Sequence, residues 1–101
     1  MTSFGLPDGI VKAIVDELKS RDQVKRAVLF GSRARGDFRD RSDIDLAIEC
    51  DGPMPTGLRT ALDRAARIYK IDIVDMYALQ DERLRRDIDR EGVGIYRKSR
   101  S

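Results

Sequence analysis

Histidine and tryptophan are absent from this 101-residue chain, and cysteine occurs once, as Cys50. The lack of histidine excludes histidine-based catalytic triads, histidine general bases and zinc sites that contain histidine. A single cysteine forms no internal disulfide and gives no sign of a secreted scaffold. No apolar run approaches the length of a membrane-spanning helix, and the N-terminus lacks a signal-peptide pattern. We therefore expect a cytoplasmic protein without a membrane partner.

An excess of charge of one sign is also missing. Twenty Lys and Arg residues face 18 Asp and Glu residues, which leaves a net charge of +2. This excess is too small to predict direct nucleic-acid binding. The length indicates one small domain over residues 1–101 with one modest core, and residues 98–101 are expected to form a basic, frayed tail.

Hydrophobic periodicity predicts alternating helices and strands along the chain. We expect helices over 7–20, 32–36, about 57–69 and 80–90, and strands over 24–30, 43–49, 71–76 and 92–97. This order is typical of an α/β domain. We expect a short mixed β-sheet whose helices pack mainly on one face.

The stretch from Gly31 to Leu46 holds the most informative spacing. Gly31 and Ser32 follow an apolar strand, and ten residues separate Ser32 from Asp43 and Asp45. Side chains at i and i+2 of a strand share a face, about 6.6 Å apart along the backbone. Two carboxylates aimed at one place repel each other unless a cation lies between them, and a pair of divalent ions would neutralise them.

The third predicted strand offers two further carboxylates, Asp72 and Asp75. They lie an odd number of residues apart, so a regular strand cannot aim both at one site. If Ile71 and Ile73 face the core, Asp72 faces the same open side as the first two carboxylates. The pattern therefore predicts Asp72 as the third acid of the site.

The Gly31–Ser32 turn and the arginines after it indicate a binding site for phosphates. Such a turn offers backbone N–H groups and a hydroxyl, and Arg33 and Arg35 add positive charge. Together they suit a polyphosphate substrate beside an anionic metal site. The alternative interpretation is a solvated charged loop that follows an ordinary turn.

The joint spacing resembles a known signature. Gly31-Ser32, ten residues and then Asp43-Ile44-Asp45 are similar to the Gly-Ser-x10-Asp-x-Asp motif of the nucleotidyltransferase superfamily that includes DNA polymerase beta. The fuller Gly-Ser-Arg-Ala-Arg-Gly, with the later Ile-Asp-Ile-Val-Asp, resembles the minimal nucleotidyltransferase (MNT) branch of bacteria and archaea. The resemblance extends from the first predicted helix to the last predicted strand.

The resemblance implies a polymerase beta-like fold and a metal-dependent transfer of a nucleoside monophosphate. It implies that Asp43, Asp45 and Asp72 hold two Mg²⁺ ions, for which Mn²⁺ can substitute, and that Asp72 is also a candidate base. It further implies that Gly31 and Ser32 contact the phosphates of a nucleoside triphosphate, which we expect to be ATP.

No residues are left over for an acceptor domain, so we expect either a partner that supplies the acceptor, in a hetero-oligomer, or a homodimer that builds a groove. The resemblance implies which partner this is. MNT proteins are commonly paired with a helical HEPN protein as the antitoxin of a toxin–antitoxin module, and some transfer AMP to a tyrosine of the toxin. Apolar Val74 and Met76 beside the acids would provide a docking surface, unless helices or a second copy of the chain cover them. Two alternatives stay open: a stand-alone enzyme that acts on a small molecule or a different protein, and a non-catalytic module that silences a toxin by occlusion.

Overall fold

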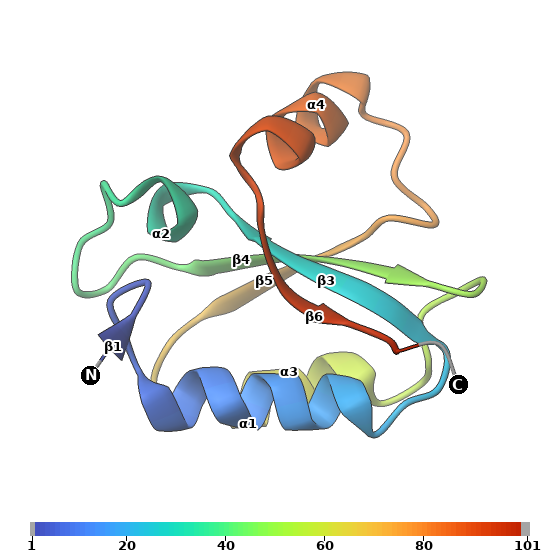
Figure 1. Cartoon of the computed structure of the whole chain (residues 1–101), viewed down its shortest axis with the longest axis horizontal. Helices are drawn as coiled ribbons and strands as arrows, with labels where there is room; N and C mark the ends of the chain where they lie inside the picture. Colours follow the sequence, from blue (N-terminus) through green and yellow to red (C-terminus); the bar gives the residue numbers. More distant parts are fainter. Residues whose placement is uncertain (1, 100–101) are drawn as a thin grey trace.

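A computed structural model describes residues 2–99, in which a four-stranded sheet lies between two layers of helix (Figure 1). The helices are α1 (Asp8–Lys19), α2 (Ser32–Arg35), α3 (Leu58–Ala65) and α4 (Glu82–Glu91), and the strands are β1 (Thr2–Ser3), β2 (Leu6–Pro7), β3 (Val24–Phe30), β4 (Ile44–Cys50), β5 (Ile71–Asp75) and β6 (Val93–Arg97). The eight predicted elements occur in the predicted order, and most of their ends shift by only one or two residues. The third helix is shorter than predicted, because it ends at Ala65.

The periodicity did not predict the hairpin of β1 and β2. Phe4 and Gly5 join its two strands, and both have positive φ angles, 58° and 71°. Two consecutive positive φ angles are characteristic of the tight turns that connect antiparallel strands. Each of these strands has only two residues, which is too short for an alternating pattern to be recognised.

The main sheet has the strand order β5-β4-β3-β6. Strand β4 pairs in parallel with β5, and the other two pairings are antiparallel, so the sheet is mixed as predicted. The parallel pair requires a crossover connection, which α3 provides. The C-terminal end of β3 therefore lies beside the start of β4, which in turn lies beside the start of β5.

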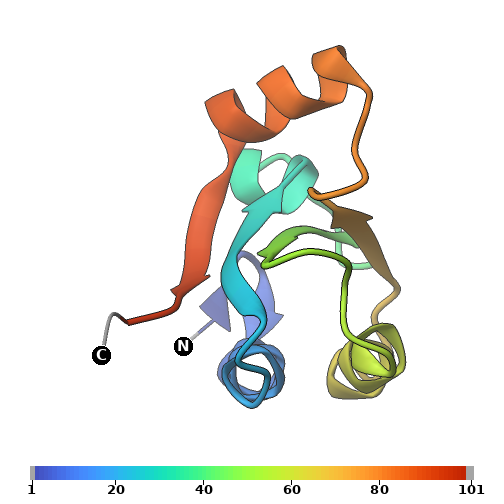
Figure 2. The ribbon, with the colours of Figure 1, turned by 90° about the vertical axis from the view of Figure 1, so that its right-hand side faces the viewer.

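The larger hydrophobic core lies between the sheet and the pair α1 and α3, on the side called here the lower face (Figure 2). Ile10, Ile14 and Leu18 recur every four residues along α1 and are all buried. The lower face also receives Ile44 and Leu46 of β4, both fully buried. The alternation along β4 thus sends its acids to the opposite, upper face.

Helix α4 packs on the upper face, across the sheet from α1 and α3 (Figure 2). Its Ile88 forms a second core with Phe30, Ala47 and Met76, and Val74 packs against this cluster. Met76 is only 7% exposed. The predicted docking surface of Val74 and Met76 is therefore wrong, because a helix of the same chain covers it.

The C-terminal end of β6 is tied to the start of β3. The Lys98 backbone N–H donates to the Lys25 carbonyl at 2.8 Å, and the Lys98 ammonium donates to the Asp22 carbonyl at 2.7 Å. Lys98 is thus anchored, and residues 100–101 of the expected frayed tail lie outside the described residues. Within residues 2–99, no helix combines the length and apolar character needed to cross a membrane.

Candidate active site

The turn after β3 depends on the conformation of Gly31. Its φ of 76° and ψ of −156° lie in a region that essentially only glycine adopts. Its carbonyl accepts hydrogen bonds from Ala34 and Arg35, which starts α2. A Cβ at this position would also collide with Oδ2 of Asp45. Gly31 thus allows the chain to turn directly against the Asp45 carboxylate.

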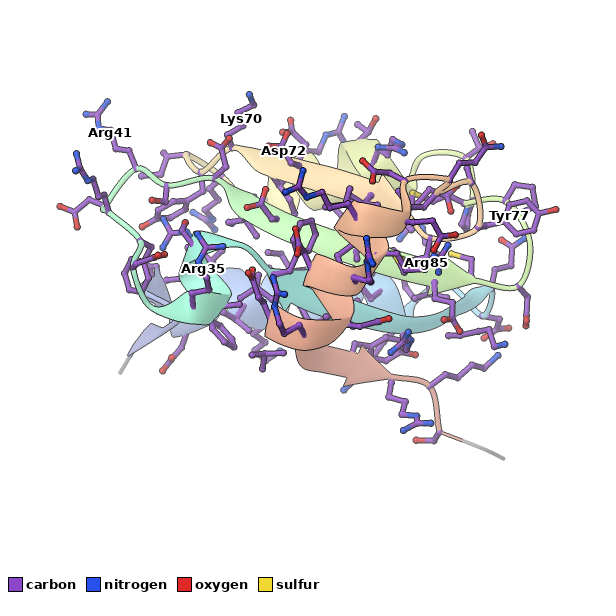
Figure 3. All side chains as sticks on the ribbon, turned by 90° about the horizontal axis from the view of Figure 1, so that it is seen from above. Arg35, Arg41, Lys70, Asp72, Tyr77 and Arg85 are labelled. Atoms are coloured by element: carbon purple, nitrogen blue, oxygen red, sulfur yellow. The ribbon has the colours of Figure 1, made fainter. Side chains whose placement is uncertain are left out.

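Two of the three predicted acids are direct neighbours in the sheet. Asp45 of β4 pairs with Asp72 of β5 in the parallel ladder and with Phe30 of β3 on its other side. Residues paired in this way point to the same face, about 4.8 Å apart between strands. Asp43 directly precedes β4 and lies on the same side by strand parity. The sheet therefore brings all three acids to one end of the upper face, where Figure 3 labels Asp72.

The electrostatics of Asp45 show that the acids act on one another. Burial raises the pKa of Asp45, and the negative charges of Asp72 and Asp43 raise it further. The positive charge of Arg35 opposes this rise. The Asp45 carboxylate is therefore held in an unfavourable environment, which an added cation would improve.

The donor set fits a hard divalent cation. Aspartate oxygens are the ligands that Mg²⁺ and Mn²⁺ prefer, and both ions commonly complete their shells with water and substrate phosphates. Among residues 2–99, no three acidic, histidine or cysteine side chains converge on a single ion position. An ion at this site would therefore bind one or two aspartates together with oxygens from outside the protein.

Arg35 extends from α2 toward solvent near the acids (Figure 3). Its guanidinium donates to Asp37 at 3.2 Å and to Glu91 of α4 at 3.0 Å, and these hydrogen bonds raise the pKa of Arg35. Because the Arg35 side chain is exposed, these ion pairs are weak and exchangeable. Arg35 is therefore exposed and able to exchange its partners, and its contact with a phosphate stays a prediction.

Arg33 has a different role. Its side chain is 1% exposed, and its guanidinium donates to the carbonyls of Phe4, Asp40 and Ser42 at 2.9–3.2 Å. It also lies over the rings of Phe38 and Tyr69, about 5 Å from each centroid. The predicted phosphate contact of Arg33 is contradicted by this placement, because its guanidinium is turned into the protein and engaged there.

Two residues near the acids were not predicted. The Lys70 ammonium lies 4.0 Å from Oδ2 of Asp43, and Glu91 holds Arg35. Lys70 could have been found, because it precedes Asp72 by two residues and shares its face. Glu91 could not have been found from the sequence, because only the packing of α4 on the sheet brings it near the site.

Comparison with known proteins adds the family to this geometry. A family model described as polymerase beta, nucleotidyltransferase, matches residues 12–101. The chain belongs to this nucleotidyltransferase family. The predicted resemblance to the polymerase beta-like nucleotidyltransferases and the predicted α/β fold with a mixed sheet are thereby confirmed. The helices lie on both faces of the sheet rather than mainly on one, because α4 covers the upper face.

One relative of this nucleotidyltransferase is MJ0604 of Methanocaldococcus jannaschii, which is assigned as a protein adenylyltransferase. It is 49% identical over 43 residues, which cover 41% of this chain and 43% of the relative. The matched segment thus spans less than half of the length of that protein.

Two solved structures share the fold. One is a toxin–antitoxin complex with AMP-PNP, with a TM-score of 0.73, 22% identity, and coverage of 87% of this chain and 73% of that one. The other contains a tri-AMPylated Shewanella oneidensis HEPN toxin with its MNT antitoxin, with a TM-score of 0.66, 19% identity, and coverage of 88% and 71%. At these identities the likeness establishes the fold.

Proposed function

We propose that this nucleotidyltransferase transfers AMP from ATP to a hydroxyl of a protein partner, and that this partner is a HEPN-type toxin which the transfer silences. The observation that carries the proposal is the placement of Asp45 between Asp72 and the Gly31 turn. This arrangement brings a cluster of acids that a cation would neutralise directly against the turn, and the turn would itself contact the phosphates of the nucleotide.

The chain's residues divide the work of binding. Gly31 and Ser32 receive the triphosphate at the turn, and the exposed Arg35 neutralises phosphate charge by leaving its ion pairs with Asp37 and Glu91. Asp43, Asp45 and Asp72 would hold two Mg²⁺ ions, or Mn²⁺ ions. When bound, these ions would supply charge neutralisation to the attacking and leaving oxygens.

The transfer is a single displacement at phosphorus. The acceptor hydroxyl oxygen forms a bond to the α-phosphorus of ATP, the bond from this phosphorus to the bridging oxygen breaks, and pyrophosphate leaves. Asp72 would accept the hydroxyl proton; its greater exposure among the three acids and its position on an edge strand support this role. Positioning and charge neutralisation provide most of the catalysis in such reactions.

Two similarities support the choice of a protein acceptor. MJ0604 is assigned as a protein adenylyltransferase, and one protein of the same fold was crystallised with a HEPN toxin that carries AMP. The proposal extends both features to this chain.

Co-expression with a HEPN-type toxin tests the proposal. Intact-mass measurement of that protein should show the addition of one or more AMP units with the wild-type chain and none with Asp43→Ala/Asp45→Ala. The double variant should also fail to relieve toxicity. Asp75→Asn is a matched control, because Asp75 lies on the same strand as Asp72 but its carboxylate accepts from the Tyr77 N–H.

Two outcomes would contradict the proposal in different ways. A partner that is silenced yet unmodified would leave occlusion as the function. AMP transfer to a small molecule, with the partner unaffected, would leave a stand-alone enzyme.

A further inference from the structure

Strand β5 is one of the two edge strands of the main sheet, and among residues 2–99 no strand pairs with its second edge. Backbone hydrogen bonds at both ends of β5 show which residues face β4. The Ile44 N–H donates to the Lys70 carbonyl at 2.8 Å, and the Met76 N–H donates to the Ile48 carbonyl at 2.9 Å. Because pairing alternates along a strand, the even-numbered residues of β5 bond to β4. The backbones of Ile71 and Ile73 therefore face outward.

A side-chain contact agrees with this parity. Arg59 of α3 reaches around the edge and donates to the outward carbonyl of Ile73 at 3.3 Å. Arg59 itself is exposed, so this hydrogen bond can be exchanged for another. Charged side chains are a common means of protecting an open strand edge.

The open edge borders a groove that contains one of the proposed catalytic acids. The groove has a volume of about 430 Å³ and is lined by Arg59, Thr60 and Asp63 of α3 and by Ile71, Asp72 and Ile73 of β5. It thus joins the outward-facing backbone of β5, exchangeable side chains and Asp72 in one concave surface. An extended peptide meets each of these features, because its own backbone pairs with the edge.

We propose that an extended segment of the acceptor protein adds to β5 as an edge strand and thereby presents the hydroxyl that receives AMP. The proposal rests on the proposed function and names how the substrate is recognised. In either strand direction, the residue opposite Asp72 points to the same face of the sheet as Asp72, with Cβ atoms about 5 Å apart. A tyrosine, serine or threonine at that register would lie beside Asp72, with Asp45 one strand further away on β4. Backbone hydrogen bonds between the acceptor segment and β5 would provide the binding. The register of this pairing would determine which hydroxyl-bearing residue receives AMP.

A bulky side chain placed in the groove tests the proposal through its effect on the rate of AMP transfer to the partner. Thr60→Trp should fill the groove and lower AMP addition to the HEPN-type protein by about tenfold or more, since it removes the edge contact. The affinity for Mg·ATP, measured by calorimetry without partner, should not change. Arg64→Trp is the matched control, because Arg64 is exposed on the same helix and does not line the groove. Equal transfer by wild type and Thr60→Trp would overturn the proposal.

Hydrogen exchange of backbone amides tests the same contact without relying on AMP transfer. The amides of Ile71 and Ile73 should exchange more slowly when the HEPN-type protein is added, and less so in Thr60→Trp. Unchanged exchange at both amides would overturn the proposal. Protection that is present in the chain alone and rises with its concentration would assign the edge to a second copy and overturn it equally. If the wild-type chain transfers no AMP, the proposed function itself fails, whatever the exchange at β5 shows.

Discussion

At the residue scale, position 31 imposes two requirements that only the amino acid glycine meets. Its backbone angles are nearly unique to glycine, and its missing side chain leaves room for the Asp45 carboxylate. We expect Gly31→Ala to lower the free energy of unfolding by about 1–3 kcal/mol and to abolish transfer. Gly36→Ala is the control, because Gly36 has a φ of 93° but open space at its Cβ. Urea unfolding measures the stability of the two variants, and AMP addition to the partner measures their activity. Equal AMP transfer by Gly31→Ala and Gly36→Ala would show that the close contact between Gly31 and Asp45 is unimportant.

Arg33 stabilises the loop that leads into β4 and is not available to bind a ligand. Its fork satisfies three carbonyls that a lysine ammonium cannot reach together. We expect Arg33→Lys to lower the free energy of unfolding by about 1.5–3 kcal/mol, because several partly buried hydrogen bonds to backbone carbonyls are lost. Arg39→Lys, in the exposed part of the same loop, should change it by less than about 0.5 kcal/mol. A metal-free stability that is unchanged in Arg33→Lys would argue against this role.

The raised pKa of Asp45 predicts a pH dependence with a definite sign. Because the folded state favours the protonated carboxyl, the native state binds more protons than the unfolded state in the titration range of Asp45. Stability from this group is present at low pH and is lost as the pH rises through the folded pKa. Asp45→Asn should therefore raise the Tm of the metal-free protein at pH 7, and the gain should vanish in acid. Added Mg²⁺ should stabilise the wild type more than Asp45→Asn, and a Tm that falls in the variant at pH 7 would contradict the interpretation.

At the scale of elements, α4 is the helix whose position changes the interpretation of the upper face. Ile88 is 2% exposed and closes the core over Phe30 and Met76. We expect Ile88→Ala to lower the free energy of unfolding by about 2–5 kcal/mol, since it leaves a cavity. Ile68→Ala removes the same atoms from a side chain that is 91% exposed and should have almost no effect. Similar losses in both variants, measured by urea unfolding, would mean that α4 does not pack on the sheet.

At the scale of the whole molecule, the two cores share a single sheet. The lower core contains Leu62 of α3, and the upper core contains Ile88 of α4. Because each strand contributes side chains to both faces, neither core can form without the sheet. We expect Leu62→Ala and Ile88→Ala each to shift one cooperative thermal transition without splitting it. Calorimetric and van't Hoff enthalpies should agree in both, and a separate early transition in Ile88→Ala would show that α4 unfolds independently.

Much of the acid site could be predicted because strand parity is local. The two-residue spacing of Asp43 and Asp45, and the choice of Asp72 over Asp75, follow from the alternation of side chains within a strand. The choice between Arg33 and Arg35 did not follow, because both lie on a helix of four residues with the same charge. Only the packing of Phe38 and Tyr69 around Arg33 separates their roles.

The amino-acid sequence by itself determined the order of the main elements, the face of β4 that carries the acids and the glycine turn beside them, since these depend on neighbours along the chain. The tertiary structure decided the pairing of Asp45 with Asp72, the burial of Arg33, the cover of α4 over Val74 and Met76, and the open edge of β5. These features depend on strand order and on which helix meets which face. Such contacts join residues far apart in the chain, so the local periodicity of the sequence cannot predict them.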